Sequence, residues 1–437
     1  MPFYGAVSEA VMRHLYTAIL YLIIPLVLLR FLWRSLSAPD YRRRVGERFG
    51  HLPRLQARGG LWVHAVSVGE VQAGAPLIKR LLQDHPQLPV IVTTTTPTGS
   101  RRLQELLGER VMHVYAPYDV PLVVRRFLAA AHPRLAVFIE TEVWPNILEQ
   151  CRRRGIPTIL ANARLSERSA RGYGKLGGFT RETFGKLGLV AAQAEADAQR
   201  FIALGALPAQ VVVTGSIKFD VRLPPSLQEQ SAVIKRSWGE DRPVWIAAST
   251  HEGEDEQVLE AHRLVLEALP DALLVLVPRH PERFVRVGQL ALKQGFCLVR
   301  RSQGRPCDAG TQLFLGDSMG ELPMFFTAAD LAFMGGSLVP HGGHNPLEPA
   351  ASGVPVVTGP HMFNFSAITE MLLAADAAVQ VASATELAET VIAWLGDASL
   401  RARIGENGRR VVEQNRGALD RLVGLIGEMI SESGQST

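Results

Sequence analysis

Cysteine is scarce in this chain of 437 residues: the three are Cys151, Cys297 and Cys307, and no two of them have the CxxC spacing. Their scatter argues against a disulfide framework and against a zinc cluster, and it fits a reducing compartment. Two phosphate-binding signatures are also missing. No GxGxxG follows a first strand and no GxxxxGK[ST] occurs, which disfavours dinucleotide oxidoreductases and P-loop enzymes.

Charged residues make up 20% of the chain and apolar residues 47%, a balance typical of globular proteins and not of disordered ones. A chain of this length exceeds one ordinary hydrophobic core, so we expect two domains. Residues 1–220 contain 28 Lys and Arg against 16 Asp and Glu, whereas the remainder contains 18 against 26. The basic first half suits an anionic surface, either lipid head groups or nucleic acid, or it serves solubility alone.

One long apolar run lies near the N-terminus. Residues 14–29, HLYTAILYLIIPLVLL, carry no formal charge, and Trp33 extends the run. The length is near the minimum for a helix that crosses a bilayer, and the arginines after it, Arg42–Arg44 among them, place the rest of the chain in the cytoplasm by the positive-inside rule. A cleaved signal peptide is disfavoured because SLSA runs into Pro39. We expect residues 1–36 to be a membrane anchor that either spans the bilayer or lies in its interface.

After this segment, apolar β-branched runs alternate with amphipathic stretches. Continuous apolar strands that alternate with helices predict parallel sheets covered on both faces. We therefore expect an α/β protein with two Rossmann-like domains that face a cleft, at residues 37–220 and 241–410, with a linker at 221–240 and a closing segment at 411–437. The expected strands are 61–66, 90–95, 111–116, 135–140, 158–160, 189–193 and 211–215, then 244–249, 273–278, 297–299, 313–316, 331–335, 354–359 and 377–381.

Ligands of such sheets bind at the carboxyl ends of the strands, and a carboxylate follows the first strand closely. Ser67 and Glu70 of the segment SVGE come directly after the run 61–66. Ser67 is suited to cap the next helix, and Glu70 either closes a capping box or acts as a general base. The two roles can coexist.

Two further polar groups follow strands of the first domain. Glu140 ends the run 135–140, and Glu142 lies two residues further on. Two carboxylates at a strand end are costly unless they are solvated or used, although acidity before a helix is an alternative. Glu140 is the first choice because it is nearer the strand. Lys218 in GSIK is either a cation for a carboxylate or phosphate, or a solvated surface lysine.

The second domain offers groups suited to phosphate. Arg279, after the run 273–278, is placed to meet a phosphate with two parallel hydrogen bonds, or it forms a structural ion pair. The segment 316–322, GDSMGEL, predicts a loop that brings backbone amides to a ligand before a helix.

The strongest pattern is the glycine-rich run 335–348, GGSLVPHGGHNPLE. Asn345 suits an N-cap and Pro346 the first helical position, so a helix N-terminus would point its free amides at a ligand. Glu348 either closes a capping box or accepts hydrogen bonds from ribose hydroxyls. His341 and His344 have the spacing of metal ligands, but no carboxylate or cysteine partner is in register, which disfavours a metal site.

These motifs, in this order, resemble one family: the membrane-associated Kdo (3-deoxy-D-manno-octulosonic acid) transferases of lipopolysaccharide inner-core synthesis. The matching segments cover nearly the whole chain: SVGE, IETEVWPN, GSIKFD, VPRHPERF, GDSMGEL and GGHNPLEPAASGVPV. The resemblance implies a GT-B fold with an N-terminal acceptor domain, a C-terminal CMP-sugar-binding domain and a last helix that packs back across. It implies CMP-Kdo as donor and the tetra-acylated lipid A precursor, lipid IVA, as acceptor, on the cytoplasmic side of a bacterial inner membrane.

By position, the resemblance makes Glu70 the general base and Glu140 and Lys218 supporting groups near the reacting centre. A monophosphate leaving group carries little charge, so an arginine and a helix N-terminus suffice without Mg²⁺, and we expect no metal or other cofactor. The acceptor's two phosphates give the basic half a role that needs no nucleic acid. The implied CMP pocket comprises Pro278, Arg279, Met319, Gly320, Glu321, Asn345, Pro346, Leu347 and Glu348.

Three other interpretations stay open. One is a membrane-associated GT-B transferase that uses a UDP-sugar and a lipid acceptor. Another is a GT-B-like nucleotide-sugar epimerase, against which the anchor and the basic half count. The third is a non-catalytic membrane scaffold, which the set of Glu70, Arg279 and Glu348 disfavours. The sequence gives neither the number of Kdo residues added nor the oligomeric state.

Overall fold

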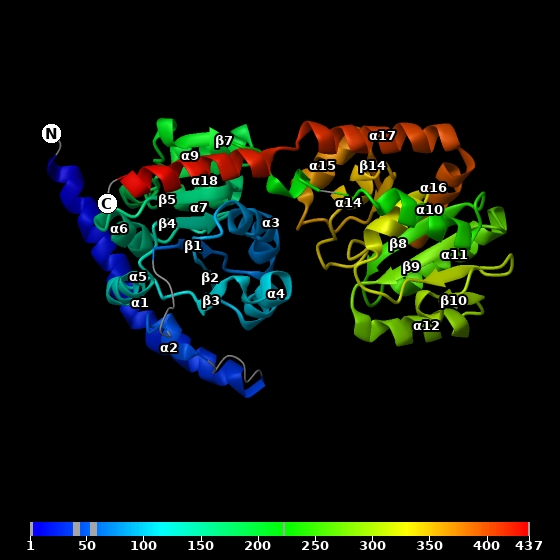
Figure 1. The fold of residues 1–437 in the computed structure, drawn as a ribbon, viewed down its shortest axis with the longest axis horizontal. Helices are drawn as coiled ribbons and strands as arrows, with labels where there is room; N and C mark the ends of the chain where they lie inside the picture. The colour runs from blue at the N-terminus through cyan, green and yellow to red at the C-terminus, as the bar shows by residue number, and fades with distance from the viewer. Residues whose placement is uncertain (1–2, 38–43, 53–58, 222, 436–437) are drawn as a thin grey trace. The chain divides into compact units, whose positions relative to one another are not determined.

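The computed structural model describes residues 3–37, 44–52, 59–221 and 223–435. Arg42 and Arg43 of the predicted basic stretch lie outside these residues. The chain divides into two compact units, Met1–Lys218 with Arg416–Thr437, and Phe219–Asn415. Each unit has one seven-stranded parallel sheet with helices on both faces (Figure 1), so the predicted α/β architecture is confirmed.

The first unit has the strand order β3-β2-β1-β4-β5-β6-β7. Each of its strands overlaps one of the first seven predicted runs. The strands are β1 Leu61–His64, β2 Val90–Thr94, β3 Met112–Tyr115, β4 Leu135–Ile139, β5 Thr158–Ala163, β6 Leu189–Ala192 and β7 Val211–Val213. The helices are α1 Phe3–Ser37, α2 Val45–Arg48, α3 Val68–Asp84, α4 Pro97–Leu107, α5 Pro121–Ala131, α6 Pro145–Arg153, α7 Glu167–Gly174, α8 Gly178–Phe184, α9 Glu195–Ala203 and α18 Ala418–Gln435.

The second unit has the strand order β10-β11-β9-β8-β12-β13-β14. Its strands are β8 Val244–Thr250, β9 Leu273–Pro278, β10 Leu298–Arg300, β11 Leu313–Leu315, β12 Leu331–Met334, β13 Val356–Thr358 and β14 Ala378–Gln380. Its helices are α10 Leu227–Trp238, α11 Asp255–Ala268, α12 Phe284–Lys293, α13 Leu322–Ala328, α14 Leu347–Ala351, α15 Ser366–Ala374, α16 Ala384–Gly396 and α17 Ala398–Gln414.

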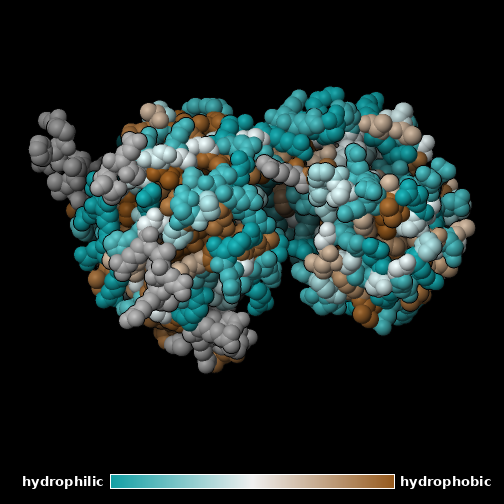
Figure 2. All heavy atoms as spheres, in the orientation of Figure 1, coloured by the Kyte–Doolittle hydropathy of each residue, from teal (hydrophilic) through white to brown (hydrophobic). Residues whose placement is uncertain are grey.

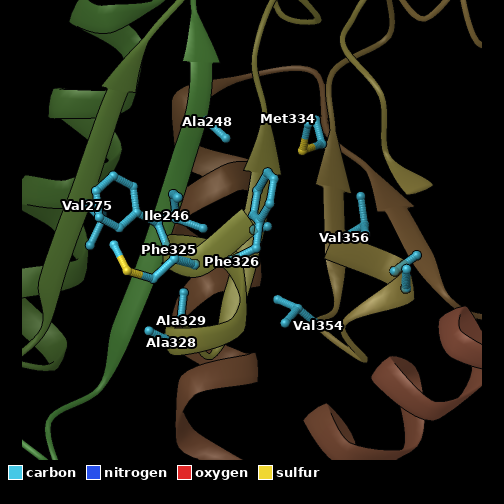
Figure 3. Packing of buried hydrophobic residues seen from close by; sticks show 14 of the residues in the cluster. Ile246, Ala248, Val275, Phe325, Phe326, Ala328, Ala329, Met334, Val354 and Val356 are labelled. Carbon is cyan, nitrogen blue, oxygen red and sulfur yellow. The ribbon is translucent and has the colours of Figure 1, made fainter. Parts of the chain in front are cut away.

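The strands are apolar throughout because both faces of each sheet are covered. In β1, Leu61 and Val63 enter the core beneath α3 and α18, while Trp62 between them enters the core on the other face. The second unit repeats this alternation along β8. Figure 3 shows one of its cores, where Phe325 and Phe326 of α13 pack near Ile246 of β8.

Residues 227–238, inside the segment 221–240 expected to be a linker, form α10. Leu227, Ile234 and Trp238 of this helix are buried in the core of the second unit. The chain therefore enters its second core directly after Lys218. At the other end of the second unit, α18 returns to the first unit and packs on α3, with Leu422 and Ile426 in that core.

Helix α1 is 35 residues long and lies along the first unit beside α6 and α8 (Figure 1). Within the described part of the chain, its segment Val11–Arg30 is the one helix long and apolar enough to cross a membrane. Figure 2 shows brown apolar side chains among teal polar ones on the first unit, part of which is covered by grey atoms.

Candidate functional site

Glu70 lies in the first turn of α3, at the carboxyl edge of the first sheet. The Ser67 hydroxyl caps this helix by accepting a hydrogen bond from the Glu70 backbone amide at 3.3 Å. In return, the Glu70 carboxylate accepts from the Val66 amide at 2.6 Å and from the Ser67 hydroxyl at 2.9 Å. The predicted helix cap is therefore present, and it holds the carboxylate in one orientation without using all of its lone pairs.

The surroundings of Glu70 favour its protonated form. Burial, and next the negative charge of Glu142, raise the pKa of Glu70 to about 7, and Glu140 adds a smaller effect in the same direction. The bonds from Val66 and Ser67 oppose this shift. A carboxyl group with a pKa near neutral pH is suited to accept a proton from a substrate hydroxyl.

Glu142, the less favoured of the two predicted carboxylates, is the one that contributes more to the shift at Glu70. The Trp144 indole donates a hydrogen bond to its carboxylate at 2.6 Å. The His64 ring, at the end of β1, has Nε2 3.9 Å from the same carboxylate. Because burial lowers the pKa of His64 to about 3, the ring is neutral and this contact is no ion pair.

Glu140 and Lys218 are brought together from the ends of β4 and β7. The Lys218 ammonium lies 3.5 Å from the Glu140 carboxylate. Glu140 has φ 61°, a left-handed conformation that costs a non-glycine residue about 1–3 kcal/mol and often marks a functional position. The structure thus gathers Glu70, Glu140, Glu142 and Lys218 at one edge of the first sheet.

Asn162 is a member of this edge that the sequence pattern did not reveal. It is the last residue but one of β5, has φ 52°, and is fully buried. Its side-chain oxygen accepts a hydrogen bond from the Ile217 amide at 3.1 Å, which positions the turn Ile217–Phe219 that carries Lys218. An asparagine at the carboxyl end of an otherwise apolar strand was the available signal.

The second unit brings Arg279 and Glu348 near each other. Pro278 ends β9 and Arg279 follows it, with its backbone amide bonded to Thr250 of β8 at 3.0 Å. Burial raises the pKa of Glu348, while the Asn345 side chain and the charge of Arg279 act in the opposite direction. This pair sits at the carboxyl edge of the second sheet, where the CMP pocket was predicted.

Helix α14 begins one residue later than predicted. Pro346 occupies the cap position and Leu347 is the first helical residue. The Asn345 side chain still caps the helix, because its oxygen accepts from the Leu347 amide at 3.2 Å, and its amide nitrogen donates to Glu348 at 3.4 Å. Glu348 therefore bonds the cap side chain, and no capping box with the Asn345 backbone forms.

Glu254 organises the start of the glycine-rich run and was not predicted. This carboxylate is fully buried, and it accepts hydrogen bonds from the amides of Gly336, Ser337 and Leu338 at 2.6–3.0 Å and of His251 at 3.2 Å. These amides are therefore occupied by a protein carboxylate. At Gly335 a Cβ would lie 2.6 Å from the Ser249 carbonyl oxygen, so the close passage of the loop over β8 requires glycine.

The predicted loop after β11 is present and precedes α13. Met319 is 64% exposed, and Gly320 has φ 83°. Glu321 is engaged by Arg301 through two hydrogen bonds of 2.7 and 2.9 Å, and this contact is the main reason that the pKa of Glu321 is lowered. Because β11 is the neighbour of β9, the loop lies at the same sheet edge as Arg279.

His251, His341 and His344 gather beside this edge. The His251 ring stacks on His341 with centroids 4.2 Å apart, and its Nε2 lies 2.9 Å from that of His344. Burial lowers the pKa of His251 to about 4 and that of His344 to about 3. Among the described residues, no group of three or more His, Cys, Asp or Glu side chains could hold a metal ion.

One large cavity of the first unit lies away from the carboxylates. It measures about 1360 Å³ and is lined by residues that precede β1, β4 and β5, including Gly59, Arg134 and Pro157. It therefore opens at the amino edge of the sheet, opposite Glu70. Ligands of open parallel sheets bind at the other edge, so this cavity is not the candidate site.

Comparison with known proteins places this geometry in a family. Residues 43–221 match the family of 3-deoxy-D-manno-octulosonic-acid transferases (kdotransferases), and residues 241–411 match the glycosyl transferases group 1. A 3-deoxy-D-manno-octulosonic acid transferase from Haemophilus influenzae is 43% identical over 417 residues, which are 95% of this chain and 98% of that protein. The chain belongs to the Kdo transferase family.

A second relative with the same name, from Bordetella pertussis, is 37% identical over 438 residues, covering 95% of this chain and 98% of that protein. A solved structure described as a putative UDP-N-acetylglucosamine 2-epimerase from Listeria monocytogenes matches with a TM-score of 0.54 and 16% identity, covering 86% of this chain and 98% of that one. This likeness shows the fold alone. The family matches make the chain a glycosyltransferase, and its fold is GT-B, as the motifs predicted.

Proposed function

We propose that this glycosyltransferase transfers Kdo from CMP-Kdo to lipid IVA, the tetra-acylated precursor of lipid A, in lipopolysaccharide core synthesis. The observation that carries the proposal is the Glu70 carboxylate. It lies in the first turn of a helix capped by Ser67, and burial and Glu142 raise its pKa to about 7. Residues 37–220 would bind the acceptor and residues 241–410 the donor. The apolar helix near the N-terminus supports work at a membrane, and the arginines that follow it support the cytoplasmic side of the inner membrane.

Glu70 is the proposed base for the acceptor. Its carboxylate takes the proton of a sugar hydroxyl as that oxygen forms a bond to the anomeric carbon of Kdo. The bond from this carbon to the phosphate of CMP breaks, and CMP leaves with its electrons, so the configuration inverts. Lys218, now paired with Glu140 at 3.5 Å, is a proposed partner for the carboxylate of Kdo.

Arg279 is the proposed contact for the leaving phosphate. A guanidinium suits two phosphate oxygens at once, and Glu348 beside it suits ribose hydroxyls. The remaining proposed pocket residues are Pro278, Met319, Gly320, Glu321, Asn345, Pro346 and Leu347. A monophosphate carries less charge than a diphosphate, so we propose that the reaction needs no divalent metal.

Donor competition tests the proposal against a UDP-sugar enzyme. CMP is expected to raise the midpoint of thermal unfolding and to inhibit transfer of labelled Kdo to lipid IVA, whereas UDP has neither effect. Protection by UDP but not by CMP would favour the UDP-sugar alternative. Mass spectrometry of the product, with excess donor, gives the number of Kdo residues added.

A further inference from the structure

Helix α1 is fixed to the first unit by polar side chains. Tyr16 donates a hydrogen bond to Asp119 at 2.9 Å, and the Arg13 guanidinium lies 3.0 Å from the Glu149 carboxylate. The Asn146 side-chain amide donates to Thr17 at 3.1 Å. These contacts are long-range in sequence and come from one side of the helix. The segment is therefore built onto the globular unit as well as being apolar.

The two sides of α1 differ in exposure. Leu22, Leu26 and Leu29 are 75%, 64% and 61% exposed, whereas Leu20 and Val27 are half-buried against the unit. A helix with one apolar side docked on a domain and one open is suited to lie at a membrane surface with the open side in the lipid. A hydrocarbon chain in that lipid is then close to the docked side.

A cavity of about 380 Å³ lies on the docked side of α1. Leu20, Ile23, Ile24 and Val27 form an aliphatic stretch of its helix wall, next to Arg30. The opposite wall comes from loops at the carboxyl ends of the first sheet, with Arg48 of α2 and Ile147 of α6. The size falls within the range of about 300–1,000 Å³ of small-molecule sites. Its lining includes Leu20, Ile24, Val27, His64, Ala116 and Trp144.

The cavity shares two residues with the catalytic edge. His64 and Trp144 line it, and both contact the Glu142 carboxylate, at 3.9 and 2.6 Å. Glu142 in turn raises the pKa of Glu70. A chain in this cavity would therefore hold the rest of its molecule beside the proposed base.

We propose that this cavity binds a fatty acyl chain of the lipid acceptor, with α1 as one wall of the acceptor site. The proposal rests on the proposed function. Three features select this occupant: an aliphatic stretch of the helix wall, an exposed apolar side opposite it on the same helix, and an end beside the Glu142 carboxylate. The anchor thus takes part in recognising the acceptor as well as in holding the enzyme at the membrane.

Filling the cavity from either wall tests this. Leu20→Trp places a larger side chain on the helix wall of the cavity. Ala116→Leu places a larger side chain on the opposite wall and leaves the sequence of α1 unchanged. Leu22→Trp is the matched control, because Leu22 is two residues from Leu20 but on the exposed side. Full-length enzyme in detergent micelles is assayed with lipid IVA and with the same head group stripped of its acyl chains, and binding to phosphatidylglycerol vesicles is measured in parallel.

Both filling variants are expected to lower kcat/KM for lipid IVA by tenfold or more, since each displaced methylene group is worth about fourfold in affinity. Activity on the stripped head group and the vesicle binding should match the wild type, as should Leu22→Trp in every assay. Unchanged kcat/KM for lipid IVA, equal losses on both acceptors, or a loss of vesicle binding alone would each overturn the cavity assignment. If the wild type transfers Kdo to neither acceptor, the proposed function itself fails.

Discussion

Glu70 and Glu254 occupy matching places in the two units, because each follows the first strand of its sheet, β1 or β8. Burial raises the pKa of both. Glu254 is fully buried and accepts hydrogen bonds from four backbone amides. Glu70 is partly exposed, accepts from one amide and one hydroxyl, and has two carboxylates as neighbours.

The difference separates a carboxylate that shapes a loop from one that can exchange a proton. The lone pairs of Glu254 are taken up by amides of the chain, so it is suited to fix the glycine-rich run and not to meet a substrate. Glu70 keeps lone pairs that can accept further hydrogen bonds. The negative charges of Glu142 and Glu140 raise its pKa, so it can bind and release a proton near neutral pH. The same residue type at the same topological place thus has two functions, set by its neighbours.

The largest expected effect is on Glu70. Glu70→Gln should lower kcat for transfer by about 10²–10⁴, the usual contribution of a general base, while CMP binding measured by calorimetry stays within a factor of two of the wild type. Folding raises the pKa of Glu70 from 4.5 to about 7, so the unfolded chain ionises this group at lower pH than the folded one. The contribution of Glu70 to the free energy of unfolding therefore falls as pH rises from 4.5 toward 7. The variant should therefore be no less stable than the wild type at pH 8.

Replacing Glu254 should have the opposite result, with a loss of stability and of CMP binding. Glu254→Ala leaves buried amides without an acceptor and should lower the free energy of unfolding by about 3 kcal/mol, with CMP binding weakened at the same time. Chemical denaturation of the full chain, followed by Trp fluorescence, measures this. A stable Glu254→Ala variant that binds CMP normally but transfers no Kdo would reverse the assignment of the two carboxylates.

A substitution at Arg279 should weaken the binding of the donor and leave that of the acceptor unchanged. Arg279→Lys keeps the charge but loses the second parallel hydrogen bond, so the KM for CMP-Kdo is expected to rise about 10-fold to 100-fold. The KM for the lipid acceptor should stay unchanged. A variant with normal donor KM and lowered stability would instead make Arg279 a structural partner of Glu348.

The smallest expected effect is a shift in the pH dependence of kcat/KM when Glu142 is replaced. Glu142→Gln removes the charge that contributes most, after burial, to the raised pKa of Glu70. The acid limb of kcat/KM should therefore move to lower pH, and by more than in Glu140→Gln, whose charge has the weaker effect. Equal profiles for the two variants would show that Glu142 does not tune the base.

Much of the fold followed from local pattern. Continuous apolar runs give buried parallel strands wherever both sheet faces are covered, and each of the fourteen expected runs overlaps a strand. Ser67 was recognisable as a cap because capping depends on residues within one helical turn. The end of a strand is equally local, so the places of Glu70, Glu140 and Arg279 could be predicted.

Other features depend on contacts that local pattern does not contain. Tyr16 meets Asp119, 103 positions along the chain, and nothing in an apolar segment indicates which side will dock. Glu254 meets amides more than 80 residues away. The choice between Glu140 and Glu142 depends on side-chain distances to Glu70. The one-residue error at α14 arose because Pro346 suits both the cap and the first helical position.

The central claim is that Glu70 is the base that activates the acceptor, and the pH dependence of kcat/KM tests it most directly. Wild-type activity should rise tenfold per pH unit on the acid side and level off above about pH 7, where Glu70 is ionised. The small residual activity of Glu70→Gln should show no such limb. An identical limb in the variant, or a wild-type limb near pH 4.5, would contradict the account.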